Sequence, residues 1–285
     1  MIMKLLKYIL LIISLLTVTA GGCVFYAFKI EPYRLKVNDY DLNERQKGMT
    51  DIKIVQISDL HIKEDFTYEN LAKVVRRVNA QAPDIVLFTG DLYDNYAKYH
   101  DDDHIIAELQ KISATYGKLA IWGNRDHGGG ASRQYANIME SAGFTLLKNE
   151  NLNVTLDNGG KILFTGLDDS LLGSPILPDL REGDAAEHKI LLTHEPDAAD
   201  DYLDLGFDVI LSGHSHGGQI NIPFLPFLNE LAVSATALSS QYSGGMYLPD
   251  PDTGTKLYVN TGIGTTHISA RFGVVPEITV FHLYN

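Results

Sequence analysis

Seven side chains of the kind that bind metal ions occur in five short segments of this sequence. They are Asp59, His61, Asp91, Asn124, His194, His214 and His216. Carboxylate, amide and imidazole ligands together suit Mn, Fe, Zn, Co or Mg, whereas Cu(I) prefers sulfur. Seven ligands exceed what one such ion takes from protein in an open site, so the set favours two divalent ions. Two ions about 3.5–4 Å apart can hold a bridging hydroxide and bind a phosphate oxygen.

Each of the five segments directly follows an apolar run that we interpret as a buried strand. The runs are residues 52–57, 85–88, 119–122, 190–192 and 209–211. Helical spacing over 70–81 and about 103–115 separates the first three, and this alternation is typical of parallel βαβ units. Ligands of open α/β folds bind at the carboxyl ends of strands, so the seven side chains are expected to converge there.

The second half of the chain favours antiparallel pairing at two places. Hairpins are predicted over 151–166 and 247–258, with turns at 157–160 and 250–254. Residues 277–283 predict a closing strand. We therefore expect an α/β fold with two central sheets flanked by helices, in one domain over residues 50–285.

Composition restricts the partners of the chain. The 285 residues are 45% hydrophobic and carry a net charge of −13. This charge argues against nucleic acid as a partner, because phosphate backbones require a basic face. A single cysteine, Cys23, excludes an internal disulfide.

The run from Lys7 to Lys29 is uncharged and mostly apolar. At about 1.5 Å per residue, a helix of this length crosses a hydrocarbon core of about 30 Å. We predict a membrane anchor over 1–29 and a juxtamembrane connector over 30–49. The alternatives are a cleaved signal peptide, for which the run is long, and lipidation at Cys23.

The five segments resemble, in order and spacing, the motifs of the calcineurin-like metallophosphoesterases. The matching residues are Asp59-x-His61, Gly90-Asp91, Gly123-Asn124, His194 and Gly213-His214-x-His216. Residues 57–61, 193–196, 213–220, 262–264 and 276–278 are similar to the membrane-anchored bacterial branch of that family. The resemblance implies a four-layer sandwich of two mixed β-sheets flanked by helices. It also implies a single-pass protein of the bacterial inner membrane. Basic residues flank the apolar run on both sides, so they do not fix the side that the domain faces.

The resemblance also implies a ligand for each metal position. One ion would be held by Asp59, His61, Asp91 and His216. The other would be held by Asp91, Asn124, His194 and His214, so that Asp91 bridges the pair. Hydroxide between the ions would attack phosphorus in line, with nearby donors stabilising the equatorial oxygens.

One position departs from the commonest family pattern. Many relatives have a histidine where this chain has Arg125, and the sequence Gly-Asn-Arg-Asp is similar to the UDP-2,3-diacylglucosamine pyrophosphatases of lipid A biosynthesis. Arginine cannot act as a general acid but can bind phosphate oxygens. His127 is the alternative acid, or else a solvated loop residue. Arg271 is a candidate for a second phosphate, or else forms a surface salt bridge.

Two further features complete the expectations. Residues 222–228 form an apolar segment with two prolines, interpreted either as an exposed loop for an acyl chain or bilayer, or as a buried irregular loop. Five histidines follow no strand in this way and are expected on the surface or in the core: His100, His104, His188, His267 and His282.

The expected function is hydrolysis of a phosphoester or pyrophosphate bond by a dimetal enzyme. The expected substrate is a membrane-associated lipid such as UDP-2,3-diacylglucosamine or a phospholipid, with the lipid bilayer as a partner of the N-terminal helix. Two alternatives remain: a phosphodiesterase acting on a soluble nucleotide-type substrate, and a non-catalytic membrane-tethered binding module.

Overall fold

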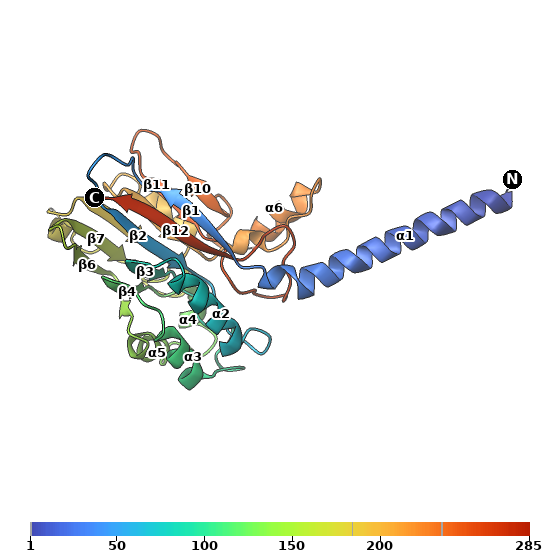
Figure 1. The fold of residues 1–285 in the computed structure, drawn as a ribbon, viewed down its shortest axis with the longest axis horizontal. Helices are drawn as coiled ribbons and strands as arrows, with labels where there is room; N and C mark the ends of the chain where they lie inside the picture. Colours follow the sequence, from blue (N-terminus) through green and yellow to red (C-terminus); the bar gives the residue numbers. More distant parts are fainter. Residues whose placement is uncertain (1, 184, 235) are drawn as a thin grey trace.

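A computed structural model describes residues 2–183, 185–234 and 236–285 (Figure 1). Two six-stranded sheets pack face to face, and helices cover the outer face of the first sheet. The N-terminal helix α1 (Ile2–Lys29) projects from this domain. The expected α/β sandwich of two mixed sheets is confirmed.

The first sheet has the strand order β1-β12-β2-β3-β4-β5. Its strands are β1 (Lys36–Asp41), β2 (Asp51–Ile57), β3 (Ile85–Phe88), β4 (Gly117–Ala120), β5 (Thr145–Leu146) and β12 (Glu277–Tyr284). Strands β2 to β5 run parallel, and β12 pairs antiparallel with β2. The helices α2 (Tyr68–Asn79), α3 (Asp102–Leu109) and α5 (Tyr135–Ser141) bury apolar side chains against its outer face.

The second sheet has the order β10-β11-β9-β8-β7-β6. Its strands are β6 (Glu150–Thr155), β7 (Lys161–Gly166), β8 (His188–Leu192), β9 (Val209–Ser212), β10 (Gly245–Tyr247) and β11 (Lys256–Val259). Both predicted hairpins are confirmed as antiparallel pairs, β6 with β7 and β10 with β11. Its outer face is covered by the 3-10 segment η3 (Pro196–Tyr202) and loops, so the fourth layer is thin.

The main core lies between the two sheets. Ile54 and Leu87 of the first sheet pack in one cluster with Phe164, Ile190 and Leu211 of the second. These strands are buried on both sides, which explains why they appear in the sequence as continuous apolar runs. The packed sheets give the loops at their carboxyl ends a rigid base.

The segment over 30–49, predicted as a connector, contains a strand at residues 36–41 that sequence analysis did not identify. These residues form β1, which pairs parallel with β12 from Lys36–Glu277 to Asp41–His282. Its sequence, KVNDYD, is polar, because this edge strand is only partly covered. A strand of this kind carries no apolar run by which periodicity could identify it.

Helix α1 meets the domain at its last turn. The carbonyl oxygen of Ala27 accepts a hydrogen bond of 3.0 Å from the backbone N–H of Arg271. The ring of Tyr26 also stands edge-on to that of Phe272, with centroids 6.1 Å apart. These two contacts join the last turn of α1 to the loop that precedes β12. Residues Met3–Tyr33 are long and apolar enough to cross a membrane, with a mean hydropathy of 2.2.

Candidate metal centre

The structure brings the seven candidate ligands together at the carboxyl ends of the strands. Asp59 and His61 follow β2, and Asp91 follows β3. Asn124 begins the short helix α4 (Asn124–His127) after β4. His194 follows β8, while His214 and His216 follow β9. Both sheets therefore contribute to one site, and six of the seven residues are buried, with Asn124 half-buried.

The backbone at these residues is unusual. Five of the seven have positive φ, namely Asp59 (51°), His61 (44°), Asp91 (64°), His214 (69°) and His216 (51°). Residues other than glycine seldom adopt this region, and such strain costs on the order of 1–3 kcal/mol each. It persists only where the surrounding structure enforces it, which is typical of functional sites.

Neighbouring glycines allow the loops to approach each other closely. A Cβ atom on Gly213 would overlap the side chains of Ser58 and Asp59. A Cβ atom on Gly123 would overlap the carboxylate of Asp91. Glycine is therefore required at both positions by the close approach of a ligand.

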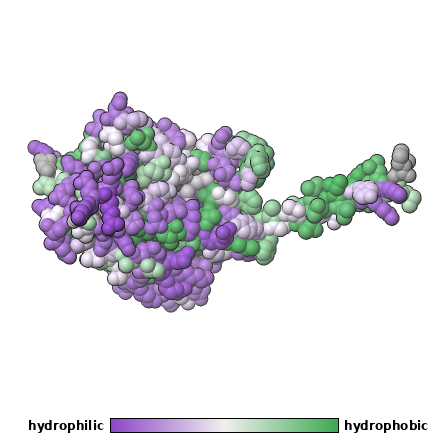
Figure 2. All heavy atoms as spheres, turned by 45° about the horizontal axis from the view of Figure 1, so that its top comes forward, coloured by the Kyte–Doolittle hydropathy of each residue, from purple (hydrophilic) through white to green (hydrophobic). Residues whose placement is uncertain are grey.

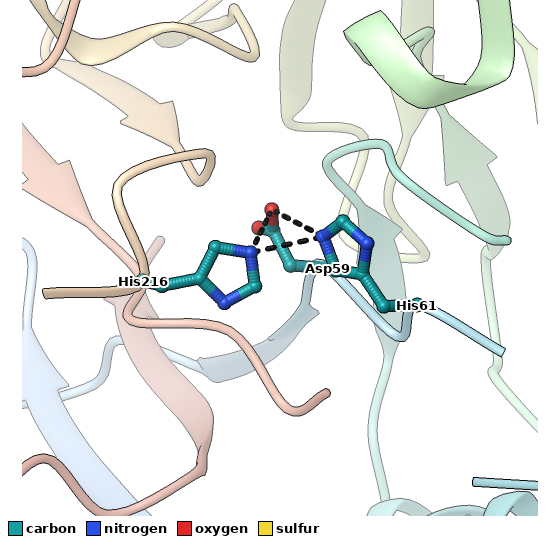
Figure 3. Close-up of side chains that lie close together, drawn as sticks. All are labelled: Asp59, His61 and His216. Atoms are coloured by element: carbon teal, nitrogen blue, oxygen red, sulfur yellow. Dashed lines mark hydrogen bonds and ion pairs between the residues drawn. The ribbon is translucent and has the colours of Figure 1, made fainter. Parts of the chain in front are cut away.

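The first group of ligands is Asp59, His61 and His216 (Figure 3). The Nε2 atoms of His61 and His216 are 2.9 Å apart, and they lie 3.6 and 3.4 Å from Oδ1 of Asp59. Ligands held about 2.1 Å from one ion at tetrahedral or octahedral angles are about 3.0–3.4 Å apart. Oδ1 of Asp59 is buried without a hydrogen-bond partner. An ion bound among these three atoms would satisfy all of them.

Asp91 faces two groups at once. Its Oδ2 lies 3.4 Å from Nε2 of His61, and its Oδ1 lies 3.5 Å from Nε2 of His194. Each oxygen is thus directed to a different histidine, as a bridging carboxylate requires. Oδ1 also accepts a hydrogen bond of 2.7 Å from the backbone N–H of Arg125, which fixes the rotamer.

The second group consists of Asn124, His194 and His214 together with Asp91. Nδ1 of His194 lies 2.6 Å from the carbonyl oxygen of Thr89, and Nε2 of His214 lies 2.8 Å from that of Ala237. A carbonyl accepts only from a protonated nitrogen, so the opposite ring nitrogens are left free for an ion. Nε2 of His194 and Oδ1 of Asn124 are both buried without a partner. The residues present therefore fit a second ion.

Charge in the site suits cation binding. Burial raises the pKa of Asp59, but His216 and His61 oppose it more strongly, and the pKa ends well below its usual range. Burial lowers the pKa of His216 well below its usual value, against the effect of Asp59. Burial and the neighbouring His194 also lower the pKa of His214. Burial also lowers the pKa values of His61 and His194, but Asp59 and Asp94 around His61 and Asp91 beside His194 outweigh it, so both pKa values are raised. A divalent ion binds ionised carboxylates and neutral imidazoles, so its binding displaces a proton from each of these two histidines.

Asp126 is a positioning residue that sequence reasoning missed. Its fully buried carboxylate accepts hydrogen bonds from the backbone N–H groups of Asp91 (2.8 Å), Leu92 (3.0 Å) and Gly123 (2.9 Å). It thereby ties the loop after β3 to the loop after β4. Burial and the nearby Asp91 raise its pKa to about 8, and the three N–H donors oppose that rise.

Glu195 also lies near the second group, within ligand distance of His194 and His214. Burial and a hydrogen bond with Asp169 raise the pKa of Glu195 to about 9. Its Oε2 accepts a hydrogen bond of 2.9 Å from the backbone N–H of Ser170, so this carboxyl group is engaged outside the second group.

Arg125 lines a cleft of about 390 Å³ beside the ligands. Its Nη2 donates to Oγ1 of Thr266 at 3.1 Å, which holds the guanidinium at the cleft wall. The cleft is also lined by His61, Asp91, Asn124, His214 and His216. Arg125 is therefore placed where it can reach a phosphate bound at the ligands.

His127 and Arg271 have surroundings of a different kind. Nε2 of His127 lies 2.7 Å from Oδ1 of Asp168, and neither His127 nor Arg271 lines the cleft. The guanidinium of Arg271 is fully buried and donates to the carbonyl oxygens of Gly264 and Thr261. Its Nη2 also lies 3.2 Å from Nδ1 of His216. These contacts favour a positioning role for Arg271 rather than a contact with substrate.

His267 was given no role by its place in the sequence, yet it lines the cleft. It is solvent-exposed, and its φ is 58°. It lies in the loop between β11 and β12, next to Thr266, which holds Arg125. No signal in its local sequence indicated this, because the loop reaches the cleft only through the packing of the two sheets.

The loops after the strands of two packed sheets bring carboxylates and imidazoles together at one edge. This arrangement places the protein in the class of dimetal phosphoesterases. The calcineurin-like phosphoesterase family matches residues 52–218, more than half of the chain, and the chain belongs to this family. Members of the family are metal-dependent hydrolases with a dimetal centre.

Three similar proteins illustrate the range of relatives. The uncharacterized metallophosphoesterase YkuE of Bacillus subtilis is 39% identical over 93% of this chain and 91% of that protein. The UDP-2,3-diacylglucosamine pyrophosphatase LpxG of Chlamydia trachomatis is 26% identical over 93% and 94%. The crystal structure of TT1561 of Thermus thermophilus covers 75% of this chain and 91% of that one, with 13% identity and a TM-score of 0.46.

Proposed function

We propose that the chain hydrolyses a phosphoester or pyrophosphate bond in a membrane-associated lipid. The observation that carries the proposal is the composition of the cleft beside the ligands. Its lining combines metal ligands and Arg125 with the apolar residues Ile220, Ala232, Ala237 and Ile268. A cleft lined by both phosphate-binding and apolar side chains suits a substrate with a charged head and an acyl chain. Helix α1, with its apolar surface, supports a location at a bilayer.

Each part of the site has a role in this reaction. When bound, the two ions supply hydroxide near neutral pH and offset phosphate charge. Asp59, His61, Asp91 and His216 would hold one ion, and Asp91, Asn124, His194 and His214 the other. The guanidinium of Arg125 would bind equatorial oxygens of the phosphorus under attack, where negative charge gathers.

The presence of Arg125 favours a pyrophosphate over an alkyl phosphate ester. Arginine stays charged and cannot protonate a leaving group. An alkoxide leaves poorly without a proton, whereas a phosphate group leaves as a stable anion. The similarity to LpxG supports the same substrate class, since that relative is named a UDP-2,3-diacylglucosamine pyrophosphatase.

The test is turnover by the full chain in detergent, loaded with defined divalent ions. Three substrates are compared: a nucleoside-diphosphate-linked diacyl sugar, the same nucleoside diphosphate sugar without acyl chains, and a phospholipid. The first is expected to give the highest kcat/KM, and Asp91→Asn is the inactive control. Equal kcat/KM with and without acyl chains would contradict the lipid substrate and favour a soluble nucleotide-type substrate.

A further inference from the structure

Helix α6 (Pro226–Ser234) is fastened to the turn that carries two of the metal ligands. The side chain of Asn229 donates to the carbonyl oxygens of Gly217 (2.8 Å) and Ile220 (3.1 Å). Val233, on the same face, is only 6% exposed. The inward face of α6 is therefore fixed beside His214 and His216.

The outward side of α6 and its flanking residues is apolar and exposed. The exposed fractions are 100% for Phe224, 43% for Leu225, 58% for Phe227, 65% for Leu231 and 38% for Leu238. We call these five residues the α6 apolar surface. Residues 222–238 include a single charged residue, Glu230, in a chain of net charge −13. Exposed apolar residues gathered in this way indicate an interaction surface.

The α6 apolar surface lies at the end of the domain from which α1 leaves (Figure 1). Figure 2 shows hydrophobic atoms at the α6 projection and again along α1. The two helices attach to neighbouring parts of the structure. The backbone N–H of Arg271 binds Ala27 in the last turn of α1, and the guanidinium of the same residue contacts His216. His216 belongs to the turn to which α6 is bonded. A bilayer that holds α1 is thus the partner most directly within reach of α6.

The charge of the chain also favours an apolar mode of contact. A net charge of −13 repels anionic lipid headgroups, so electrostatic attraction cannot hold the domain against a membrane. Burial of phenylalanine and leucine side chains in the interfacial layer needs no such attraction. Lys29 ends α1, and Arg34 follows the short segment Glu31–Tyr33. In a bilayer that holds α1, both would lie near the phosphate headgroups.

We propose that the α6 apolar surface inserts into the interfacial layer of the same bilayer that holds α1. The cleft, whose lining includes Ala232 of α6 and the nearby Ala237, then opens at the level of the lipid headgroups. A lipid substrate would present its phosphate to the metal ligands while its acyl chains stay in the bilayer. This inference rests on the proposed function in taking α1 as a membrane anchor.

The insertion is tested with single-cysteine labelling of the full chain. Cys23 is the only cysteine, so Cys23→Ala gives a background for Phe224→Cys carrying an environment-sensitive fluorophore. The labelled protein is reconstituted in phosphatidylcholine vesicles with brominated acyl chains. We expect blue-shifted emission, quenching by the bromines and protection from aqueous iodide.

Leu248→Cys is the matched control. Leu248 is 51% exposed and lies in the connection that leads into the amino end of β11. Because β11 runs parallel to β9, whose carboxyl end leads to His214, this connection is at the far end of the sheet. Its label should be quenched by iodide and not by the bromines. If the label at position 224 behaves like the label at position 248, the proposal is overturned.

A second arm measures turnover. Phe224→Asp with Phe227→Asp should lower hydrolysis of a vesicle-borne lipid substrate by about tenfold or more, while Leu248→Asp should not. Hydrolysis of a water-soluble aryl phosphate diester should be unchanged in both. Insertion without lipid turnover would refute the lipid substrate and leave the docking intact. Lipid turnover without insertion, or an unchanged rate in the double variant, would refute the docking alone.

Discussion

Replacement of Arg125 tests the role of the one residue that departs from the commonest family pattern. Its guanidinium is held by one hydrogen bond of 3.1 Å to Thr266, and its backbone N–H binds Asp91 independently of the side chain. Arg125→Ala should therefore preserve the fold and the bridging carboxylate. Loss of a charged donor to the transition state costs about 2.7–4 kcal/mol, by analogy with removal of an oxyanion donor.

The expected result is a fall in kcat of about 10²–10³-fold on a pyrophosphate substrate, with the metal content unchanged. Arg125→Lys should recover only part of the rate, because an ammonium cannot bind two oxygens in the geometry of a guanidinium. Thr266→Val removes the hydroxyl that holds the guanidinium and that also donates to Asp94 at 3.3 Å, but it leaves Arg125 in place, so its effect should be smaller. The assay is steady-state kinetics with metal content measured on the same samples. Wild-type rates for Arg125→Ala would refute the phosphate contact.

Three further predictions concern residues around the centre. Asp126→Asn should lower metal affinity and kcat by about 10–100-fold, because the amide nitrogen of asparagine cannot accept hydrogen bonds from the backbone N–H groups that Asp126 binds. Isothermal titration with Mn²⁺ measures the affinity, and an unchanged affinity would contradict the prediction. Arg271→Ala should weaken metal binding without raising KM, as a positioning role requires; a rise in KM alone would instead indicate a substrate contact. Burial raises the pKa of Asp168, but the backbone N–H of Ser174 and the ring of His127 outweigh it and lower the pKa. A carboxyl group whose pKa is lower in the folded than in the unfolded state stabilises the fold at pH values above its unfolded pKa. That stabilisation is lost as the pH falls through the folded pKa. Asp168→Asn should therefore lower the free energy of unfolding by about 1.5–3 kcal/mol at neutral pH, and by less in acid below about pH 4. A pH-independent difference in urea unfolding would contradict this sign.

The parts of the fold that sequence predicts are those with a strong local pattern. The apolar runs of β2, β3, β8 and β9 are buried on both sides, and α2 has an apolar face, so each was identified. Strand β1 was missed because its partly covered edge position allows polar residues. Its place in the sheet depends on pairing with β12, more than 230 residues later, which no local pattern encodes.

The same distinction applies to the site. The seven metal-type ligands were apparent because each follows a strand, and the structure brings all seven to one edge. Their positive φ angles could not be predicted, since the loops adopt them only when packed against each other. The positions of Asp126, Arg271 and His267 depend on contacts across loops or between the sheets. His267 reaches the cleft, whereas Arg271 lies buried beneath His216.

The most direct test of the central claim is the number of metal ions that each chain binds. The claim is that Asp91 bridges two ions, because its two oxygens face His61 and His194. Elemental analysis of the full chain after loading with Mn²⁺ and removal of free metal should give about two ions per chain. Asp91→Asn should weaken both sites, while Asp39→Asn, at an exposed carboxylate in β1, should leave both intact. Two ions bound equally well by Asp91→Asn, or a single ion in the wild-type chain under saturating metal, would contradict the bridged centre.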